Sequence, residues 1–341
     1  MEYVIEQLKR IMAIPSPSGY TDRAANYIRE ELAGMGYGAW LTNKGGVMAC
    51  LGGDGDPLIF SAHIDTLGAM VAEIKSNGKL RVVSVGGLNP YNTEAENCVV
   101  HCRLSGAQYE GTLQLNNASI HVNREYASTK REFKNMEVVL DAESDSAEAA
   151  AALGISVGDF VSFDPRIVVT DSGYIKSRFL DDKLSAAILL GYAKRIADGR
   201  AALKRKVYLY FTVYEEVGHG CAGAIPPDAV EIVSVDMGCV GDGLTCTERQ
   251  VSICVADSHG PYNYAVTTAL MRCAKERGID YAADVYPMYG SDAEAALYAG
   301  HELRHGLIGP GVYASHGYER SHISGAKHTL ELIEAYTLEQ N

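Results

Sequence analysis

Acidic and histidine side chains gather in five short segments of this 341-residue chain, each close to the end of an apolar run. The segments are His63-Ile64-Asp65, Asp181-Asp182, Glu215-Glu216, Asp236 and His322. Two imidazoles and several carboxylates are about what two divalent metal ions that share a bridging carboxylate require. The pattern therefore indicates metal-assisted hydrolysis.

Three of these segments follow runs that are typical of buried β-strands. The runs at residues 57–62, 207–213 and 232–235 lead into His63, the pair Glu215-Glu216, and Asp236. In open α/β sheets, ligands gather at the carboxyl ends of the strands, so we expect these side chains to meet. A flat strand would present only one of two adjacent glutamates, and Gly218 and Gly220 would permit the turn that brings both to one centre.

The residues alone leave several roles open. Residues i and i+2 of a strand point to one face, so Asp65 can accept a hydrogen bond from the imidazole of His63. The pair Asp181-Asp182 could bind metal or simply cap the helix that follows it. Among the glutamates, one could bind metal while its neighbour activates water. The sequence pattern does not choose among five C-terminal histidines, at positions 301, 305, 316, 322 and 328.

The elements that must position these residues alternate between helix and strand, which is typical of an α/β fold. Helical spacing predicts helices at residues 2–12, 22–35, 184–196, 264–277, 292–298 and 329–336. Extended segments are predicted at 46–51, 57–62, 207–213 and 232–235. We assign residues 1–66 and 167–341 to one catalytic domain with a mixed central sheet flanked by helices.

Residues 67–166 contain mainly short strand-like runs in place of the helix–strand alternation, and they are predicted to form a small inserted β-rich domain. Asn77-Gly78 predicts a hairpin between residues 71–74 and 80–85, because this dipeptide readily adopts positive φ. Further strands are predicted at 98–103, 112–115, 119–122, 137–140 and 160–163, with one helix at 146–153.

Bulk composition excludes some partners. The formal net charge of −13 argues against nucleic acid, whose phosphates require basic faces. No apolar stretch reaches the roughly 18–20 residues that span a bilayer, and the first residues lack the regions of a signal peptide. The eight cysteines show no framework spacing and are interpreted as buried thiols. We expect a cytoplasmic protein with no membrane partner.

The ordered set H-x-D, D-D, E-E, D and H resembles the co-catalytic dimetal aminopeptidases, in particular the tetrahedral (TET) and glutamyl aminopeptidases. Ala13–Gly19, Glu-Glu-Val-Gly at 215–218 and Gly-Ser-Asp-Ala at 290–293 extend the resemblance over essentially the whole chain. It implies a zinc-exopeptidase-like fold whose inserted domain serves as a dimerisation or lid domain. It also implies a homo-oligomer, namely a dodecamer.

The resemblance further implies a role for each site residue. Asp181 would bridge two metal ions, with His63 and Asp236 on one ion and Glu216 and His322 on the other. Glu215 would be the general base, Asp65 would orient His63, and the Asp181-Asp182 peptide bond would be cis. Three metal-binding carboxylates and one bridging hydroxide would balance four positive charges. Zinc suits this donor set best, and cobalt or manganese would also fit.

The predicted activity is removal of N-terminal residues from short peptides by a metal-bridging hydroxide that the Glu base activates. Lys183 and the segment Gly218-His219-Gly220 depart from the family pattern near the expected substrate pocket, which leaves substrate preference open. The alternative from the same metal chemistry is a deacylase or amidase acting on a small modified dipeptide or N-blocked amide. A glycosidase is less suitable, because it needs two carboxyl groups about 5–9 Å apart across the sugar. A catalytically silent assembly protein would contain no metal.

Overall fold

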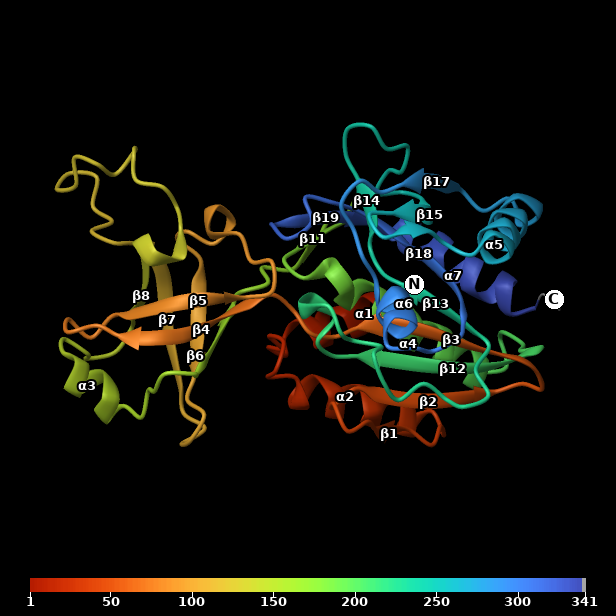
Figure 1. Cartoon of the computed structure of the whole chain (residues 1–341), viewed down its shortest axis with the longest axis horizontal. Helices are drawn as coiled ribbons and strands as arrows, with labels where there is room; N and C mark the ends of the chain where they lie inside the picture. The colour runs from red at the N-terminus through yellow and green to blue at the C-terminus, as the bar shows by residue number, and fades with distance from the viewer. Residues whose placement is uncertain (339–341) are drawn as a thin grey trace. The chain divides into compact units, whose positions relative to one another are not determined.

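The computed structural model describes residues 1–338 and divides the chain into two compact units. The first unit is Met1–Asp65 together with the chain from Arg166 onward, and the second is Thr66–Pro165. A large mixed sheet with helices forms the first unit, and a closed β-barrel forms the second (Figure 1). The predicted fold class, a mixed α/β sheet with a small inserted β-rich unit, is confirmed.

The helices of the first unit lie close to the positions that helical spacing predicts. They are α1 (Glu2–Met12), α2 (Asp22–Gly34), α4 (Leu180–Ala197), α5 (Tyr264–Arg277), α6 (Asp292–Tyr298) and α7 (Ile323–Thr337). Gly278 ends α5 with φ 64°, a left-handed conformation that glycine adopts without steric cost. The main differences are at two N-termini, since α4 begins at Leu180 rather than Leu184 and α7 at Ile323 rather than Thr329.

Four parallel strands form the centre of the large sheet and position the site. In sheet order its main path is β1 (Trp40–Leu41), β2 (Val47–Gly52), β12 (Arg205–Thr212), β3 (Gly55–His63), β13 (Glu231–Val235), β18 (Arg304–Tyr313), β19 (Glu319–His322), β11 (Tyr174–Ser177) and β10 (Val168–Val169). Strands β14 (Gly238–Val240), β15 (Val251–Asp257), β16 (Gly260–Pro261) and β17 (Tyr281–Val285) branch from it. Because β12, β3, β13 and β18 are parallel, their carboxyl ends lie at one edge.

Strand β18 is the central element that sequence patterning misses. Its glycines hide the strand signal, yet close packing explains them. A Cβ at Gly309 would lie 1.5 Å from the carbonyl oxygen of Asp236, and a Cβ at Gly311 would lie 2.2 Å from that of Thr247. At Gly306 the added atom would meet the Val266 side chain at 2.7 Å. Neighbouring backbone, and at Gly306 a neighbouring side chain, therefore occupies the space that side chains would need.

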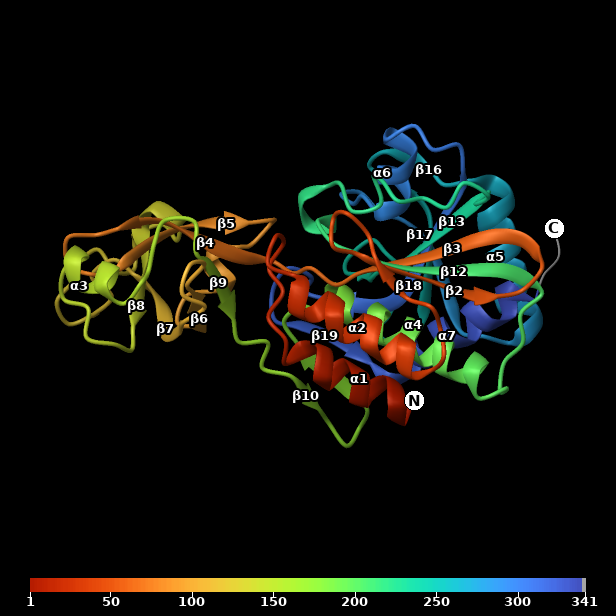
Figure 2. The same cartoon turned by 90° about the horizontal axis from the view of Figure 1, so that it is seen from below.

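Helices cover both faces of these strands. Figure 2 shows α4 and α7 on one face, where α4 contacts β3 and α7 contacts β18. On the other face α6 contacts β3, β13 and β18. The residues of β12 from Val207 to Thr212 are all buried, as expected for a strand covered on both sides. Among the described residues, no helix is long and apolar enough to cross a membrane.

The second unit is a closed barrel of six strands within residues 66–165. In barrel order these are β4 (Gly68–Ile74), β5 (Leu80–Val85), β8 (Met136–Leu140), β7 (Gln108–Leu115), β6 (Asn97–His101) and β9 (Phe160–Phe163), accompanied by α3 (Ala147–Ala152). The Asn77-Gly78 hairpin is confirmed, and Gly78 has φ 77°.

The strand predicted at residues 119–122 is wrong. The main-chain N–H groups of Val122 and Asn123 both donate to the carbonyl of Ser119, so the segment turns instead of extending. The Asn123 side chain also donates to the carbonyl of Asn117. Such local hydrogen bonds compete with strand pairing. Ile120 and Val122 are consequently left exposed.

Candidate metal centre and active site

The carboxyl ends of the parallel strands bring most of the predicted site residues together. His63 is the last residue of β3, and Asp236 directly follows β13. After β12 the chain turns at Tyr214 (φ 68°) into a single 3-10 turn, η3 (Glu215–Val217). This turn supplies the change of direction needed for both glutamates to serve one centre. Asp236 and both glutamates line one pocket of about 580 Å³, together with Asp181.

Asp181 lies between two imidazoles. One of its oxygens, Oδ1, is 3.0 Å from Nε2 of His63, and the other, Oδ2, is 3.5 Å from Nε2 of His316. The peptide bond between Asp181 and Asp182 is cis, as the resemblance implies. A carboxylate whose two oxygens face two different histidines has the arrangement expected of a ligand shared by two metal ions.

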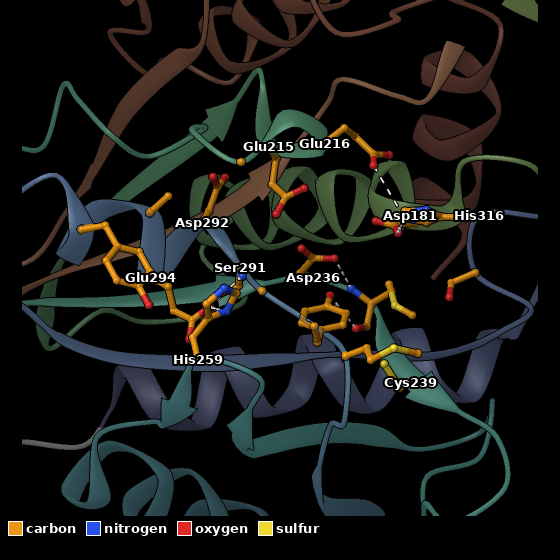
Figure 3. Close-up of a pocket in the computed structure, with 18 residues that line it drawn as sticks. Asp181, Glu215, Glu216, Asp236, Cys239, His259, Ser291, Asp292, Glu294 and His316 are labelled. Atoms are coloured by element: carbon orange, nitrogen blue, oxygen red, sulfur yellow. Dashed lines mark hydrogen bonds and ion pairs between the residues drawn. The ribbon is translucent and has the colours of Figure 1, made fainter. Parts of the chain in front are cut away.

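Glu216 and Glu215 face different histidines. Oε2 of Glu216 lies 3.7 Å from Nε2 of His316, and Figure 3 shows these two residues beside Asp181. Oε2 of Glu215 lies 3.8 Å from Nε2 of His63. At this centre two groups of residues could each hold a metal ion, because the ligand atoms within each group all lie within 4.8 Å of one another. The groups are His63 with Asp182 and Asp236, and His63 with Asp181 and Glu216. The centre therefore has two neighbouring sets of donors.

His322 does not lie with these residues. Its Nε2 is 2.9 Å from the carbonyl oxygen of Ser172, and its Nδ1 accepts a hydrogen bond from the N–H of Ser324. The reason is strand direction: β18 runs towards the catalytic edge, and β19, which ends in His322, runs antiparallel to it. The histidine that lies beside Asp181 and Glu216 is therefore His316, whereas the sequence-based prediction was His322.

The position of His316 just after a strand could have identified it from the sequence. His316 comes shortly after β18, just as His63 ends β3 and Asp236 follows β13, so strand-end placement applies to it equally. Its φ of 61° and that of Ala314 (60°) mark a sharp change of chain direction after the strand. The signal was lost because β18 itself was not recognised.

Asp65 supports the centre mainly through the backbone. Its carboxylate accepts hydrogen bonds from the N–H groups of Glu215 (3.2 Å) and Glu216 (3.4 Å), and from the Ser18 hydroxyl (2.5 Å). Nδ1 of His63 is 2.9 Å from the main-chain oxygen of Asp65 and 3.6 Å from its carboxylate. The ring of His63 is therefore held by the main chain of Asp65 and not by the predicted hydrogen bond to its carboxylate, which instead holds the turn that presents both glutamates.

Glu319 is a supporting residue that the sequence pattern does not reveal. Its Oε2 accepts a hydrogen bond from the N–H of Asp181 at 3.0 Å, and its Oε1 accepts one from the N–H of His316 at 3.1 Å. One buried side chain therefore ties together the backbones of two residues that are far apart in sequence. Such supporting contacts determine how accurately metal ligands are placed.

The centre carries more buried negative charge than its own cations balance. Burial raises the pKa of Glu215 and Glu216 well above the ordinary carboxyl value, and that of Asp236 to about 7. Burial would also raise the pKa of Asp181, but hydrogen bonds with His316 and His63 lower it. Burying unpaired carboxylates is costly, so the site favours bound cations.

Lys183 does not supply the missing positive charge. Its Nζ donates to the main-chain oxygens of Ile11 (3.1 Å) and Ile14 (2.8 Å), at the end of α1. Burial lowers the pKa of this ammonium group to about 7. Oδ1 of Asp182, in contrast, is a buried acceptor with no hydrogen-bond partner within residues 1–338. Surplus carboxylates, two imidazoles and an unpartnered oxygen suit divalent metal ions.

Comparison with known proteins identifies the family. The family model described as M42 glutamyl aminopeptidase matches residues 45–332. The chain belongs to this family. It is also 43% identical, over 97% of its length and 96% of the relative's, to YhfE of Bacillus subtilis (strain 168), which is provisionally named an aminopeptidase. This M42 protein is therefore a hydrolase of peptide bonds.

More distant relatives and solved structures agree with this assignment. The lysyl aminopeptidase of Pyrococcus furiosus is 24% identical over 62% of this chain and 60% of its own length. An aminopeptidase of Desulfurococcus kamchatkensis superposes with a TM-score of 0.88 at 22% identity, covering 99% of this chain and 95% of its own. The TET1 peptidase of Pyrococcus horikoshii gives 0.87 at 24% identity, covering 98% and 99%. These structures show that the M42 protein shares their fold.

Proposed function

We propose that this M42 protein is a dimetal aminopeptidase that removes N-terminal residues from short peptides. The observation that carries the proposal is the position of Asp181, whose two oxygens face His63 and His316. His63, Asp181 and Asp236 would hold one ion, and Asp181, Glu216 and His316 the other. Three carboxylates and two imidazoles suit zinc, with cobalt or manganese as alternatives. Bound there, the ions would polarise the scissile carbonyl and lower the pKa of water to about 7.

Glu215 is the residue best suited to move the proton. It lies in the same turn as Glu216 and its carboxylate is 3.8 Å from His63, but it is not needed as a ligand in either set. Burial raises the pKa of its carboxyl group, which suits a group that takes up a proton and releases it again. Glu215 would take a proton from the attacking water and deliver it to the leaving amine. The Asp65 carboxylate would hold Glu215 in place by accepting a hydrogen bond from the N–H group of Glu215.

Substrate and metal tests separate this proposal from its alternatives. Purified protein should hydrolyse aminoacyl amides with a free amine and lose that activity when metals are removed by a chelator. Added zinc, cobalt or manganese should restore it, and metal analysis should find about two ions per chain. Preference for N-blocked dipeptides would instead identify a deacylase or amidase. Hydrolysis that survives complete metal removal would overturn the dimetal mechanism.

We also propose that the protein is a homo-oligomer, with a dodecamer as the expected assembly. Pyrococcus horikoshii TET1, which shares the fold, is described as assembling into a tetrahedron or a large octahedral shell. In this chain the barrel unit exposes Leu104, Ile120, Val122 and Val157, side chains that an interface would cover. Native mass spectrometry tests the assembly, and a stable monomer would contradict it. The cytoplasmic location stays a prediction of the sequence.

A further inference from the structure

The pocket extends beyond the metal centre to a second group of ionisable side chains. Figure 3 shows His259 and Glu294 beside each other, away from Asp181 and His316. Asp257, the last residue of β15, lies next to this pair. None of the three residues belongs to the proposed metal-ligand sets. Because His259 and Glu294 line the same pocket, this cluster is a candidate for binding a part of the substrate that does not react.

These side chains are held in fixed positions. Nδ1 of His259 is 3.2 Å from Oε2 of Glu294 and 3.8 Å from Oδ1 of Asp257. Asp257 accepts hydrogen bonds from the Tyr262 hydroxyl and from the N–H of His259, both at 2.9 Å. The missing side chain at Gly290 makes room for the imidazole, since a Cβ there would lie 2.8 Å from its Cε1 atom. The two carboxylates are buried, and the imidazole is partly exposed.

The charge of this pocket favours a cationic ligand. No lysine or arginine is among the residues that line it. Asp236, Glu216 and Asp181 would be balanced by the two metal ions. Asp292 has its own partners, because its carboxylate accepts hydrogen bonds from the Thr212 hydroxyl and from the N–H of Cys221. Glu215 is assigned to proton transfer, so Glu294 is the remaining lining carboxylate without a metal ion, and Asp257 adds a second carboxyl group beside it.

A proton held by the carboxyl groups of Glu294 and Asp257 could be replaced by a cation of the substrate. Burial, and then the neighbouring carboxyl group of Asp257, raise the pKa of Glu294 to about 8. An ammonium or guanidinium group arriving at Glu294 could replace this proton, because an opposite charge favours the ionised carboxylate. The exposed side chains of Met288 and Tyr298 line the same pocket and offer an apolar surface to a long aliphatic stem.

We propose that Glu294, supported by Asp257, binds the cationic end of an N-terminal lysine or arginine and so selects basic residues for removal. The inference rests on the proposed aminopeptidase function and adds its substrate class. Glutamyl substrates are disfavoured, because their carboxylate would meet the same two acids.

Glu294 also has a structural role that the experiment must separate. It accepts a hydrogen bond from the N–H of Ser291 and completes the capping box that starts α6. The substitution Glu294→Gln removes the charge but keeps a side-chain oxygen that can accept this hydrogen bond. Glu276→Gln, on an exposed part of α5 outside the pocket, is the matched control for loss of one negative charge.

The test compares kcat/KM for lysyl, arginyl, leucyl and glutamyl amides in the metal-loaded wild type and both variants. In the wild type we expect lysyl and arginyl amides to exceed leucyl amides by at least about tenfold, as for a buried charge pair. Glu294→Gln should lower kcat/KM for the basic substrates by at least about tenfold and leave leucyl amides within about threefold. Glu276→Gln should change none of them, and the melting temperature of each variant should match the wild type.

The possible failures are distinguishable. A wild type that prefers leucyl or glutamyl amides overturns the inference alone. Equal losses for all substrates in Glu294→Gln also overturn it, because they show that the residue acts only as a helix cap. If no free-amine substrate is hydrolysed by metal-loaded wild type, the proposed function fails and the inference fails with it.

Discussion

Glu231 is a buried acid at the amino ends of β12, β13 and β18, and its carboxylate is paired with side chains of the protein itself. Its carboxylate lies 2.6 Å from Arg205 and 3.1 Å from Arg304, and it accepts a hydrogen bond from the Tyr336 hydroxyl at 2.7 Å. The carboxyl ends of the same strands carry several buried acids with two imidazoles beside them. A buried acid paired with arginine serves the fold, whereas an unmatched set of acids points to a ligand from outside the chain.

Glu215→Gln makes the sharpest test of the carboxyl end. The substitution removes the proton carrier without removing a proposed metal ligand, so turnover should fall by about 10²–10⁴-fold. Metal content and melting temperature should stay near the wild-type values. Kinetics with an aminoacyl amide and metal analysis of the same sample check both statements. A variant that keeps wild-type turnover would exclude Glu215 as the base.

Arg205→Met makes the corresponding test of the amino end. It leaves Glu231 buried with one arginine fewer, which should cost about 3–5 kcal/mol in the free energy of unfolding. The folded protein should still bind metal and turn over substrate normally. Urea denaturation measures the loss, and Lys206→Met is the control, because the neighbouring Lys206 pairs with Asp228 at the surface and should matter little. A loss of metal instead of stability would contradict the division between the two ends.

His316→Ala and His322→Ala test which histidine belongs to the centre. Loss of His316 should weaken the second metal position by more than about 100-fold, because a direct ligand matters more than its supporting contacts. Loss of His322 should leave both metals bound and cost about 0.5–2 kcal/mol through the missing cap on α7. Isothermal titration of metal into metal-free protein measures the first effect. The opposite result would restore His322 to the ligand set.

The metal-free protein should show a dependence of stability on pH. Burial raises the pKa of Asp236 to about 7 and that of Glu319 to about 8, so the folded state holds protons that the unfolded state has released. Their contribution is fully present below the ordinary carboxyl pKa of about 4 and is lost as the pH rises through about 7–8. The free energy of unfolding should fall by several kcal/mol between about pH 4 and pH 8, at about 1.4 kcal/mol for each unit of pKa shift.

Chemical denaturation of metal-free protein at several pH values measures this slope. Asp236→Asn should flatten it, because one of the protons that the folded state holds is no longer available. If the free energy of unfolding of the metal-free protein instead rose with pH, these acids would have partners that the structure does not reveal.

The sequence predicts local elements well and long-range pairing poorly. The helix bounds of α1, α5 and α6 follow from apolar spacing and from residues such as Gly278, which act within one turn. Strand β18 could not be predicted in this way, because its glycines make room for neighbouring backbone that is distant in sequence. The strand predicted at residues 119–122 failed for the opposite reason, since local hydrogen bonds prevail where no partner strand is in place.

By itself the sequence determined the chemical inventory: His63, Asp65, Asp181, Glu215, Glu216 and Asp236, each near the end of an apolar run. Tertiary structure decided which histidine lies beside these residues. Both His316 and His322 are close in sequence, but parallel β18 delivers the first to the catalytic edge, and antiparallel β19 carries the second away. Strand direction depends on hydrogen bonds to distant segments, and spacing along the chain does not record it.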